Sequence, residues 1–228
     1  KAGDFMKLAY VDLSRPIELD YQKATEWVIE SPELFVQYTQ MLYQQMEGAK
    51  GEFILSENDE ILDFPKQAEI ILNPLALDFN DRRIQKKLYS ELQKTAYGEN
   101  VFMDTQKLTA ELKNYIYQLE YISGYDISVN EELDLTGIFK SLNVQMEEPE
   151  EDFCERLIQY MKAMAELLRK KLIIFVNIRS YINEEQLKGV METGIHNELA
   201  LLFIENIQRD FSNDRRYYII DKDKCEVY

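Results

Sequence analysis

The chain has 228 residues and a formal charge of −16 from 42 acidic and 26 basic side chains, and 46% of its residues are hydrophobic. This composition can bury a core and argues against a globally disordered chain, and no apolar run approaches the roughly 18 residues that span a bilayer. A single histidine and two distant cysteines argue against multi-histidine metal sites, histidine-based catalytic triads and a disulfide framework. We expect a cytoplasmic protein, with no signal peptide and with Met6 as a candidate native start.

The first third of the chain predicts strands around one clear helix. Ser31-Pro32-Glu33 is a strong helix start, because serine caps, proline suits the first helical position and an acid suits the first turn; Gly48 ends this helix. The expected strands are Met6–Leu13, Ile17–Tyr21, Thr25–Glu30, Gly51–Ser56, Glu60–Phe64 and 66–72.

The middle of the chain predicts helices with little strand character. Their expected ranges are Asp81–Gly98, Asp104–Ser123 and Glu131–Leu142. Apolar residues recur at helical spacing in each, which predicts antiparallel helices that form an arm.

After an acidic linker, helices and strands alternate again. The expected order is a helix at Phe153–Arg169, a strand at 171–178, a helix from Asn183 to about Gly194, and strands at Leu199–Ile204 and Arg216–Ile220. This order favours parallel pairing through right-handed crossovers. We therefore predict an α/β fold with a mixed-sheet head domain, residues 1–73 and 148–228, and an inserted α-helical arm domain, residues 74–147.

Five carboxylates in the middle segment are the best chemical candidates: Glu120, Asp126, Glu131, Glu132 and Asp134. Together with Asn130 and loop carbonyls they offer only oxygen donors, which hard cations such as calcium prefer. The spacing does not match an EF-hand loop. The alternative is a solvated face on which Glu131 and Glu132 simply favour a helix N-terminus.

The densest basic segment is Arg82-Arg83-Ile84-Gln85-Lys86-Lys87. On a helix it would present several charges within one and a half turns, which suits contacts with phosphate groups. The alternative is an ordinary charged solvent face. Tyr89 is the only nearby aromatic residue that suggests base stacking, and the single histidine, His196, is expected to be structural.

The stretch 171–178, Lys-Leu-Ile-Ile-Phe-Val-Asn-Ile, predicts a fully buried strand. It resembles the second catalytic strand of a P-loop nucleotidase, but Asn177 stands where such a strand carries its magnesium-binding carboxylate. The chain also lacks a Gly-x-x-x-x-Gly-Lys-Ser/Thr loop. From spacing alone, ordinary core of a central sheet explains this strand equally well.

Several segments, taken in order, resemble the type II-A CRISPR adaptation proteins of the Csn-two family. The segments are Trp27 to Phe35, the helix end at Leu42-Tyr43, Asp134-Leu135 with Ile138 to Val144, Lys170 to Asn177, Tyr181-Ile182 with the acidic helix start after it, Ala200–Glu205, and Asp221–Asp223. Each motif is weak by itself, but the ordered set spans nearly the whole chain.

The resemblance implies a degenerate P-loop nucleotidase head without a nucleotide site, and a homotetrameric ring. It implies calcium-dependent, non-specific binding of double-stranded DNA ends in a basic hole, in support of spacer acquisition with the CRISPR integrase and effector nuclease. It implies no catalytic residues, and Ca2+ held by the carboxylates at 120–134. From charge, we expect DNA contacts at Arg82, Arg83, Lys86, Lys87 and Lys140.

Two other functions are compatible with the sequence. A divergent nuclease or nucleotidase would use the arm carboxylates with magnesium, although the absent phosphate loop speaks against the nucleotidase. An acidic protein-interaction module would bind a basic partner and leave DNA free.

Overall fold

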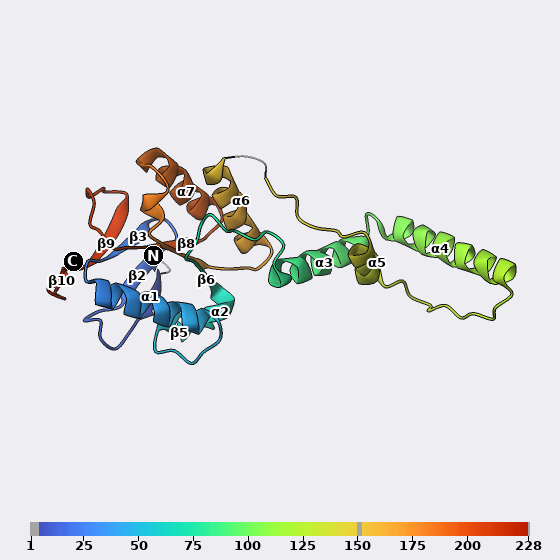
Figure 1. The fold of residues 1–228 in the computed structure, drawn as a ribbon, viewed down its shortest axis with the longest axis horizontal. Coiled ribbons are helices and arrows are strands. Elements are labelled where there is room, and N and C mark those ends of the chain that lie inside the picture. Colours follow the sequence, from blue (N-terminus) through green and yellow to red (C-terminus); the bar gives the residue numbers. More distant parts are fainter. Residues whose placement is uncertain (1–4, 150–151, 228) are drawn as a thin grey trace. The chain divides into compact units, whose positions relative to one another are not determined.

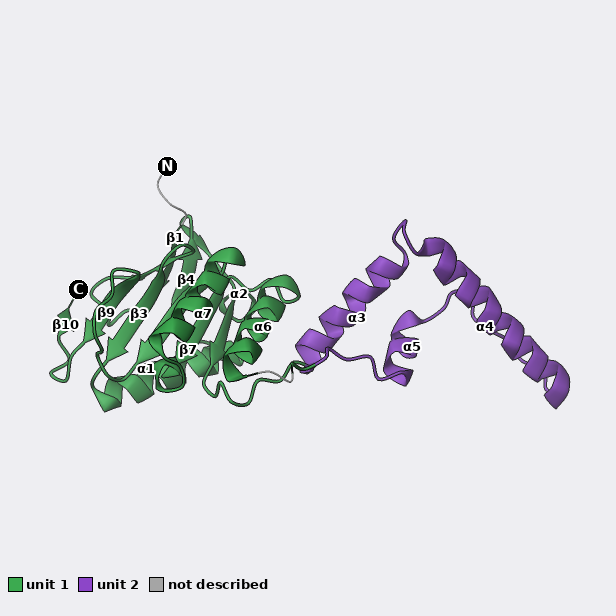
Figure 2. Ribbon diagram, turned by 90° about the horizontal axis from the view of Figure 1, so that it is seen from above, with its two compact units in different colours: residues 1–79, 148–228 green, residues 80–147 purple. Residues whose placement is uncertain are grey.

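The computed structural model describes residues 5–149 and 152–227. The chain forms two compact units: a head, residues 1–79 and 148–228, and a helical unit, residues 80–147 (Figure 2). The first boundary follows Phe79 rather than residue 73. Phe79 is buried in the head, where its ring packs edge-on against that of Tyr160 at 5.6 Å. None of the described helices is both long and apolar enough to cross a membrane.

A four-stranded antiparallel sheet forms one layer of the head. Its strands are β1 (Phe5–Ala9), β2 (Ile17–Asp20), β4 (Ile54–Glu57) and β5 (Glu60–Ile61), in the order β2-β1-β4-β5. The strands expected in these segments are therefore confirmed, although β1 is shorter than predicted because a turn begins at Tyr10, and β4 begins at Ile54 rather than at Gly51.

A six-stranded mixed sheet forms the centre of the head, in the order β10-β9-β3-β8-β7-β6. Its strands are β3 (Ala24–Ile29), β6 (Ala68–Ile71), β7 (Leu172–Val176), β8 (Ala200–Glu205), β9 (Arg215–Ile220) and β10 (Glu226–Val227). All pairs are parallel except β9–β10. The α/β class and the parallel pairing expected from the sequence are confirmed, and β10 is an additional edge strand.

Helices cover the six-stranded sheet, and alternate residues of β7 divide between its two faces. Leu172, Ile174 and Val176 enter a core shared with the four-stranded sheet and with α1 (Pro32–Met46). Toward the other face, α7 (Glu184–His196) lies so close to β8 that a Cβ at Gly194 would meet Leu201 Cδ1 at 2.8 Å. The remaining head helices are α2 (Phe64–Gln67), α6 (Phe153–Glu166) and the short 3-10 helix η1 (Ile178–Ser180) (Figure 1).

The helical unit contains α3 (Arg82–Ala96), α4 (Phe102–Ser123) and α5 (Leu135–Ser141). The expected start of α5 at Glu131 is wrong, because Asp134 has an extended backbone and Leu135 is the first residue of the helix. Leu135 is also buried, so the helix begins where its first apolar side chain finds a partner. Glu131 and Glu132 therefore lie in the loop before α5 and not in its first turn.

Candidate metal centre and nucleic-acid interface

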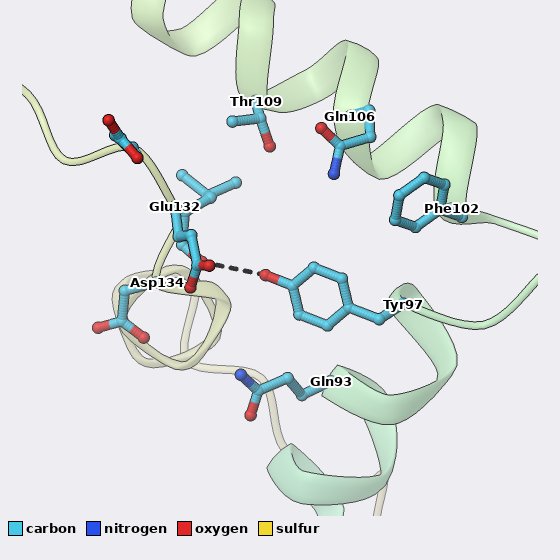
Figure 3. A pocket seen from close by; sticks show the side chains of 9 residues that line it. Gln93, Tyr97, Phe102, Gln106, Thr109, Glu132 and Asp134 are labelled. Carbon is cyan, nitrogen blue, oxygen red and sulfur yellow. Dashed lines mark hydrogen bonds between the residues drawn. The ribbon is translucent and has the colours of Figure 1, made fainter.

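A pocket of about 720 Å³ lies within the helical unit, between the end of α3, the start of α4 and the loop before α5 (Figure 3). Its lining residues are Gln93, Tyr97, Phe102, Gln106, Thr109, Glu131, Glu132, Leu133 and Asp134. Two hydrogen bonds hold the loop: the Tyr97 hydroxyl donates to the Leu133 carbonyl at 3.4 Å, and Lys113 Nζ donates to the Glu131 carbonyl at 2.6 Å. The pocket therefore combines three carboxylates with amide and hydroxyl oxygens.

The structure divides the five predicted metal ligands into two groups. Glu131, Glu132 and Asp134 line the pocket, whereas Glu120 and Asp126 are not among its lining residues. Glu120 instead accepts the Ile127 N–H at 3.1 Å, which fixes the turn that follows the end of α4.

The pocket meets the chemical preference of a calcium ion but does not gather its ligands. Its oxygen-only donor set has the right chemistry, since calcium takes six to eight oxygens at 2.3–2.6 Å. Among residues 5–149 and 152–227, however, no three Asp, Glu, His or Cys side chains are gathered closely enough to hold a metal ion. The geometry of this chain alone therefore does not form the predicted site.

The predicted DNA contacts all lie on two helices that pack together, α3 and α5. Arg82, Arg83, Lys86 and Lys87 are exposed in the first turns of α3, and Lys140 is exposed in the last turn of α5. Arg83 pairs with Asp81 at 2.8 Å. No described carboxylate lies within ion-pair distance of the other four, so their charges remain available to a ligand.

Tyr89 does not provide a stacking platform. Its side chain is buried against Phe139, and its hydroxyl donates to the Val144 carbonyl at 3.0 Å. The basic surface is therefore suited to phosphate groups rather than to bases.

The carboxyl ends of the parallel strands, where nucleotides bind in many α/β proteins, are closed in this head. Only Glu30 and Ser31 separate the end of β3 from the first residue of α1, which leaves no room for a glycine-rich phosphate loop. At the end of β7, the Asn177 N–H donates to Ile204 O at 2.8 Å, and Asn177 Oδ1 accepts the Asn206 N–H at 3.2 Å. Asn177 therefore joins β7 to β8.

Sequence reasoning missed the polar residues from α3 and α4 that line the pocket, namely Gln93, Gln106 and Thr109. The signal was weak: Gln106 and Thr109 recur three residues apart on one face of α4, but nothing in the sequence pairs that face with a distant loop.

Comparison with known proteins assigns the family. The family described as CRISPR-associated protein (Cas_Csn2) matches residues 45–224. This chain belongs to the Cas_Csn2 family. It is 25% identical over 223 residues to the CRISPR-associated protein Csn2 of Enterococcus faecalis, covering 95% of this chain and 96% of that protein. The resemblance inferred from the ordered segments is thus confirmed.

Solved structures similar to this chain include two nucleotide-binding proteins. One is a putative ABC transporter ATP-binding protein from Pyrococcus furiosus, with a TM-score of 0.41 and 9% identity over 95% of this chain and 96% of that one. The other is the ADP conformation of an ATP-binding cassette of an ABC transporter, with a TM-score of 0.48 and 10% identity over 96% of this chain and 88% of that one.

Proposed function

We propose that this Cas_Csn2 protein is a non-enzymatic DNA-binding protein that supports spacer acquisition in CRISPR adaptation. In this proposal a homotetrameric ring binds the ends of double-stranded DNA without reading sequence, and its DNA binding depends on calcium. The CRISPR integrase and the effector nuclease would be its partners. The observation that carries the proposal is the row of exposed, uncommitted cations on α3 in a chain of this family.

The cations on α3 support contacts with phosphate groups. Arg82, Lys86 and Lys87 lie within two turns of one helix, and each is free of a described carboxylate partner. Long cationic side chains on a solvent-exposed face bind the phosphate backbone mainly by releasing its counterions. Because that interaction carries no base information, the binding would be independent of sequence and steeply dependent on salt.

The closed carboxyl edge of the head supports a role without nucleotide hydrolysis. Hydrolases of the P-loop type position phosphates with backbone N–H groups of a loop between strand and helix, together with a metal-binding carboxylate. The two-residue connection from β3 to α1 offers no such loop. Asn177 stands at the carboxylate position, and its amide is already bonded to Asn206.

The role of calcium rests on the pocket carboxylates, Glu131, Glu132 and Asp134. A negative surface opposes the approach of DNA, and a bound divalent cation would cancel part of that charge. One chain does not gather these ligands closely enough to hold a metal ion. In this proposal, neighbouring chains of the ring supply the remaining ligands. Glu120 and Asp126 remain candidates as further ligands in the assembly.

The exposed face of α4 supports self-association. Within its own unit this helix buries only Thr105, whereas Met103, Tyr115, Tyr121 and Ile122 are each more than half exposed. Exposed apolar side chains of this kind, gathered on one helix, favour binding to another protein. A second copy of the chain would present the same apolar side chains, so the two α4 helices would cover each other.

A metal-dependent nuclease is the main alternative, and the three carboxylates in one pocket favour it over a nucleotidase. It predicts that duplex DNA is cleaved when magnesium is added. An acidic interaction module is the other alternative, and it predicts no DNA binding with any cation.

One binding experiment tests the proposal against both alternatives. Linear and covalently closed duplexes of equal length would be titrated with the protein in calcium, in magnesium or in chelator, and the DNA would be inspected for products. We expect retention of linear DNA in calcium, weaker retention of closed circles, release in chelator and no cleavage. Cleavage in magnesium would support the nuclease, and unchanged binding in chelator would contradict the calcium role.

The cations are tested by a charge-matched pair of variants. Arg82→Gln, Lys86→Gln and Lys87→Gln together should weaken binding and make the salt slope less steep by about 0.9 for each lost phosphate contact. The control removes the same charge from exposed lysines of the head, Lys50→Gln, Lys188→Gln and Lys222→Gln. Equal weakening in both variants would show that only net charge matters, and that α3 is not the contact surface.

A further inference from the structure

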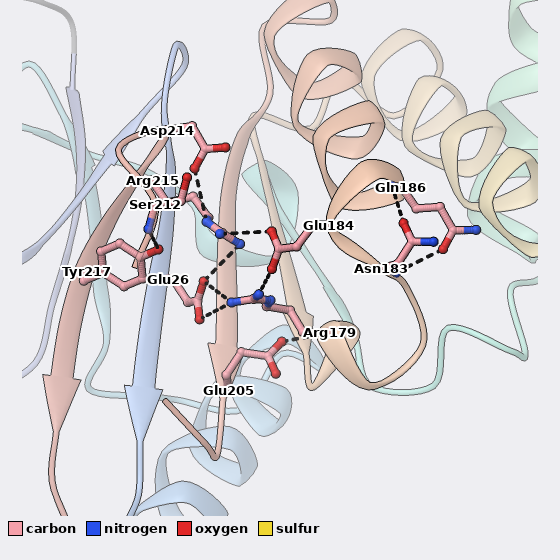
Figure 4. Close-up of polar contacts among 10 residues, drawn as sticks. All are labelled: Glu26, Arg179, Asn183, Glu184, Gln186, Glu205, Ser212, Asp214, Arg215 and Tyr217. Carbon is pink, nitrogen blue, oxygen red and sulfur yellow. Dashed lines mark hydrogen bonds and ion pairs between the residues drawn. The ribbon is translucent and has the colours of Figure 1, made fainter. Parts of the chain in front are cut away.

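A cluster of charged side chains, several of them buried, crosses the head (Figure 4). At its centre, Arg179 Nη1 donates to both carboxylate oxygens of Glu26, each at 3.1 Å. Arg179 also pairs with Glu184, the first residue of α7, and Arg215 Nη2 bonds Glu184 Oε2 at 3.2 Å. Arg215 further contacts Glu26 at 3.5 Å and Asp214 at 3.3 Å. Glu184 is thus clasped by two arginines.

Glu205 adds a carboxylate to this cluster without adding a cation. Its Oε1 accepts the backbone N–H of Arg179 at 3.1 Å, and its side chain is buried at the end of β8. The guanidinium of Arg179 is already bonded to Glu26 and Glu184. Glu26, Glu184 and Asp214 thus share the guanidinium groups of Arg179 and Arg215, whereas Glu205 forms no ion pair with any residue that the structure describes.

The charged groups that face Glu205 come from three elements. Glu26 approaches from β3, Arg179 from η1, and Arg209 from the segment after β8. Burial, reinforced by the negative charge of Glu26, raises the pKa of Glu205 to about 7, in spite of the hydrogen bond from the Arg179 backbone. Glu205 is thus the carboxyl that changes charge near neutral pH.

The fold holds Glu205 and Arg179 in register, so that a charge on one acts on the other. The bonds from Asn177 tie the ends of β7 and β8 together, two residues before Arg179 and directly after Glu205. Movement of either group away from the other would require these backbone bonds to break. When Glu205 ionises, the added negative charge must therefore be relieved by the movement of a different carboxylate.

We propose that Glu205 is a pH-sensitive switch whose ionisation releases Glu184, and with it the first turn of α7, from Arg179 and Arg215. Glu26 cannot leave, because its side chain has no exposure to solvent, whereas the Glu184 side chain is 63% exposed and can exchange its arginine partners for water. Releasing an exposed carboxylate costs far less than stranding a buried one. The clasp is closed when Glu205 is protonated and opens as it ionises.

Hydrogen exchange of the native protein tests this switch. Amide exchange in residues 183–190 would be compared at about pH 5.5 and about pH 8.5, after correction for the intrinsic effect of pH on exchange. We expect protection in this segment to fall roughly tenfold at the higher pH, the effect of one pKa unit of coupling. Glu205→Gln, which keeps the acceptor oxygen but cannot ionise, should hold the segment at its low-pH protection throughout.

Two further measurements keep the test decisive. Glu192→Gln removes an exposed carboxylate from the same helix and should behave as the wild type. If Glu205→Gln does not fold, carbon-13 NMR of the glutamate carboxyls in the wild-type protein gives the answer, because a midpoint between about pH 6 and 8 is required. The proposal is overturned if no glutamate titrates there, or if Glu205→Gln loses protection with pH as the wild type does.

Discussion

Asn177 occupies a left-handed backbone position, with a φ of 53°, between β7 and η1. Asparagine tolerates this conformation better than most residues, and its short amide reaches the backbone of Asn206. The residue that departs from the nucleotidase pattern therefore has a structural task of its own. It joins two strand ends and places Arg179 beside Glu205.

Glu205 predicts a specific dependence of stability on pH. Its pKa in the folded protein, about 7, lies above the ordinary value of 4.5, so the folded state binds the proton more tightly than the unfolded state. The stabilisation is complete below about pH 4.5 and is lost as pH rises through 7. At about 1.4 kcal/mol per pKa unit, the loss is on the order of 3 kcal/mol.

Urea denaturation from about pH 5 to 8 measures this loss. The other carboxylates titrate in both proteins, so the difference in free energy of unfolding between wild type and Glu205→Gln isolates the one group. We expect the free energy of unfolding of Glu205→Gln to rise relative to that of the wild type as pH increases. Parallel curves would contradict the assignment.

The starts of α3, α6 and α7 have side-chain caps, whereas Ser31 makes no side-chain capping hydrogen bond at the start of α1, contrary to the expectation from the sequence. Asp152 Oδ1 accepts from the backbone N–H groups of Cys154 and Glu155 at the start of α6, and Asn183 with Gln186 forms a capping box at the start of α7. Asp81 caps α3 by accepting from Arg83 N at 2.7 Å and Ile84 N at 2.9 Å. Although burial acts in the opposite direction, these bonds and the Arg83 charge lower the pKa of Asp81.

Substitution of Asp81 should loosen the helix that carries the proposed DNA contacts. Asp81→Ala removes the cap and is expected to cost about 1 kcal/mol. Asp81→Asn keeps an acceptor and should cost less. Amide exchange along α3 is the measurement, with α6 as an internal reference. Because the pKa of Asp81 is lowered, the difference between wild type and Asp81→Asn should begin to shrink near pH 4 and disappear as pH falls through that lowered pKa.

The sequence predicted those elements whose pattern is local. The continuous apolar runs predicted β7 and β8, the Ser31-Pro32-Glu33 signal predicted the start of α1, and the predicted starts of α6 and α7 lie within one residue of those observed. The order of the central sheet was not accessible, because β3 lies between β8 and β9, which are far away in sequence. The sequence predicted a start for α5 at Glu131, but the helix begins at Leu135, the side chain of which is buried.

The buried charges were missed although one signal was present. Glu26 interrupts an otherwise apolar or uncharged strand, Ala24–Ile29, and a charge inside a fully buried strand requires a partner. Its partners, Arg179 and Arg215, lie in distant segments that only the fold brings together. Of the five predicted metal ligands, only Glu131, Glu132 and Asp134 line the pocket, because no sequence pattern indicates which carboxylates the loop before α5 brings to it.

At the scale of the whole molecule, α4 predicts assembly. The Tyr121 and Ile122 side chains are 90% and 79% exposed, and covering them by a second copy would remove apolar surface from water. The double variant Tyr121→Ser, Ile122→Ser should reduce the assembled mass measured by sedimentation velocity. A control at exposed residues of the head, Tyr43→Ser with Ile207→Ser, should leave it unchanged. Equal masses for all three proteins would exclude α4 as the contact.

The two ends of the inserted unit are joined to each other by a reciprocal pair of hydrogen bonds. Asn80 Nδ2 donates to the Met146 carbonyl at 3.1 Å, and the Met146 N–H donates back to Asn80 Oδ1 at 2.9 Å. This pair of hydrogen bonds holds Asn80 and Met146 next to each other, whatever the length of the chain between them. Helical turns can therefore be gained or lost between Asn80 and Met146 without moving these two residues apart.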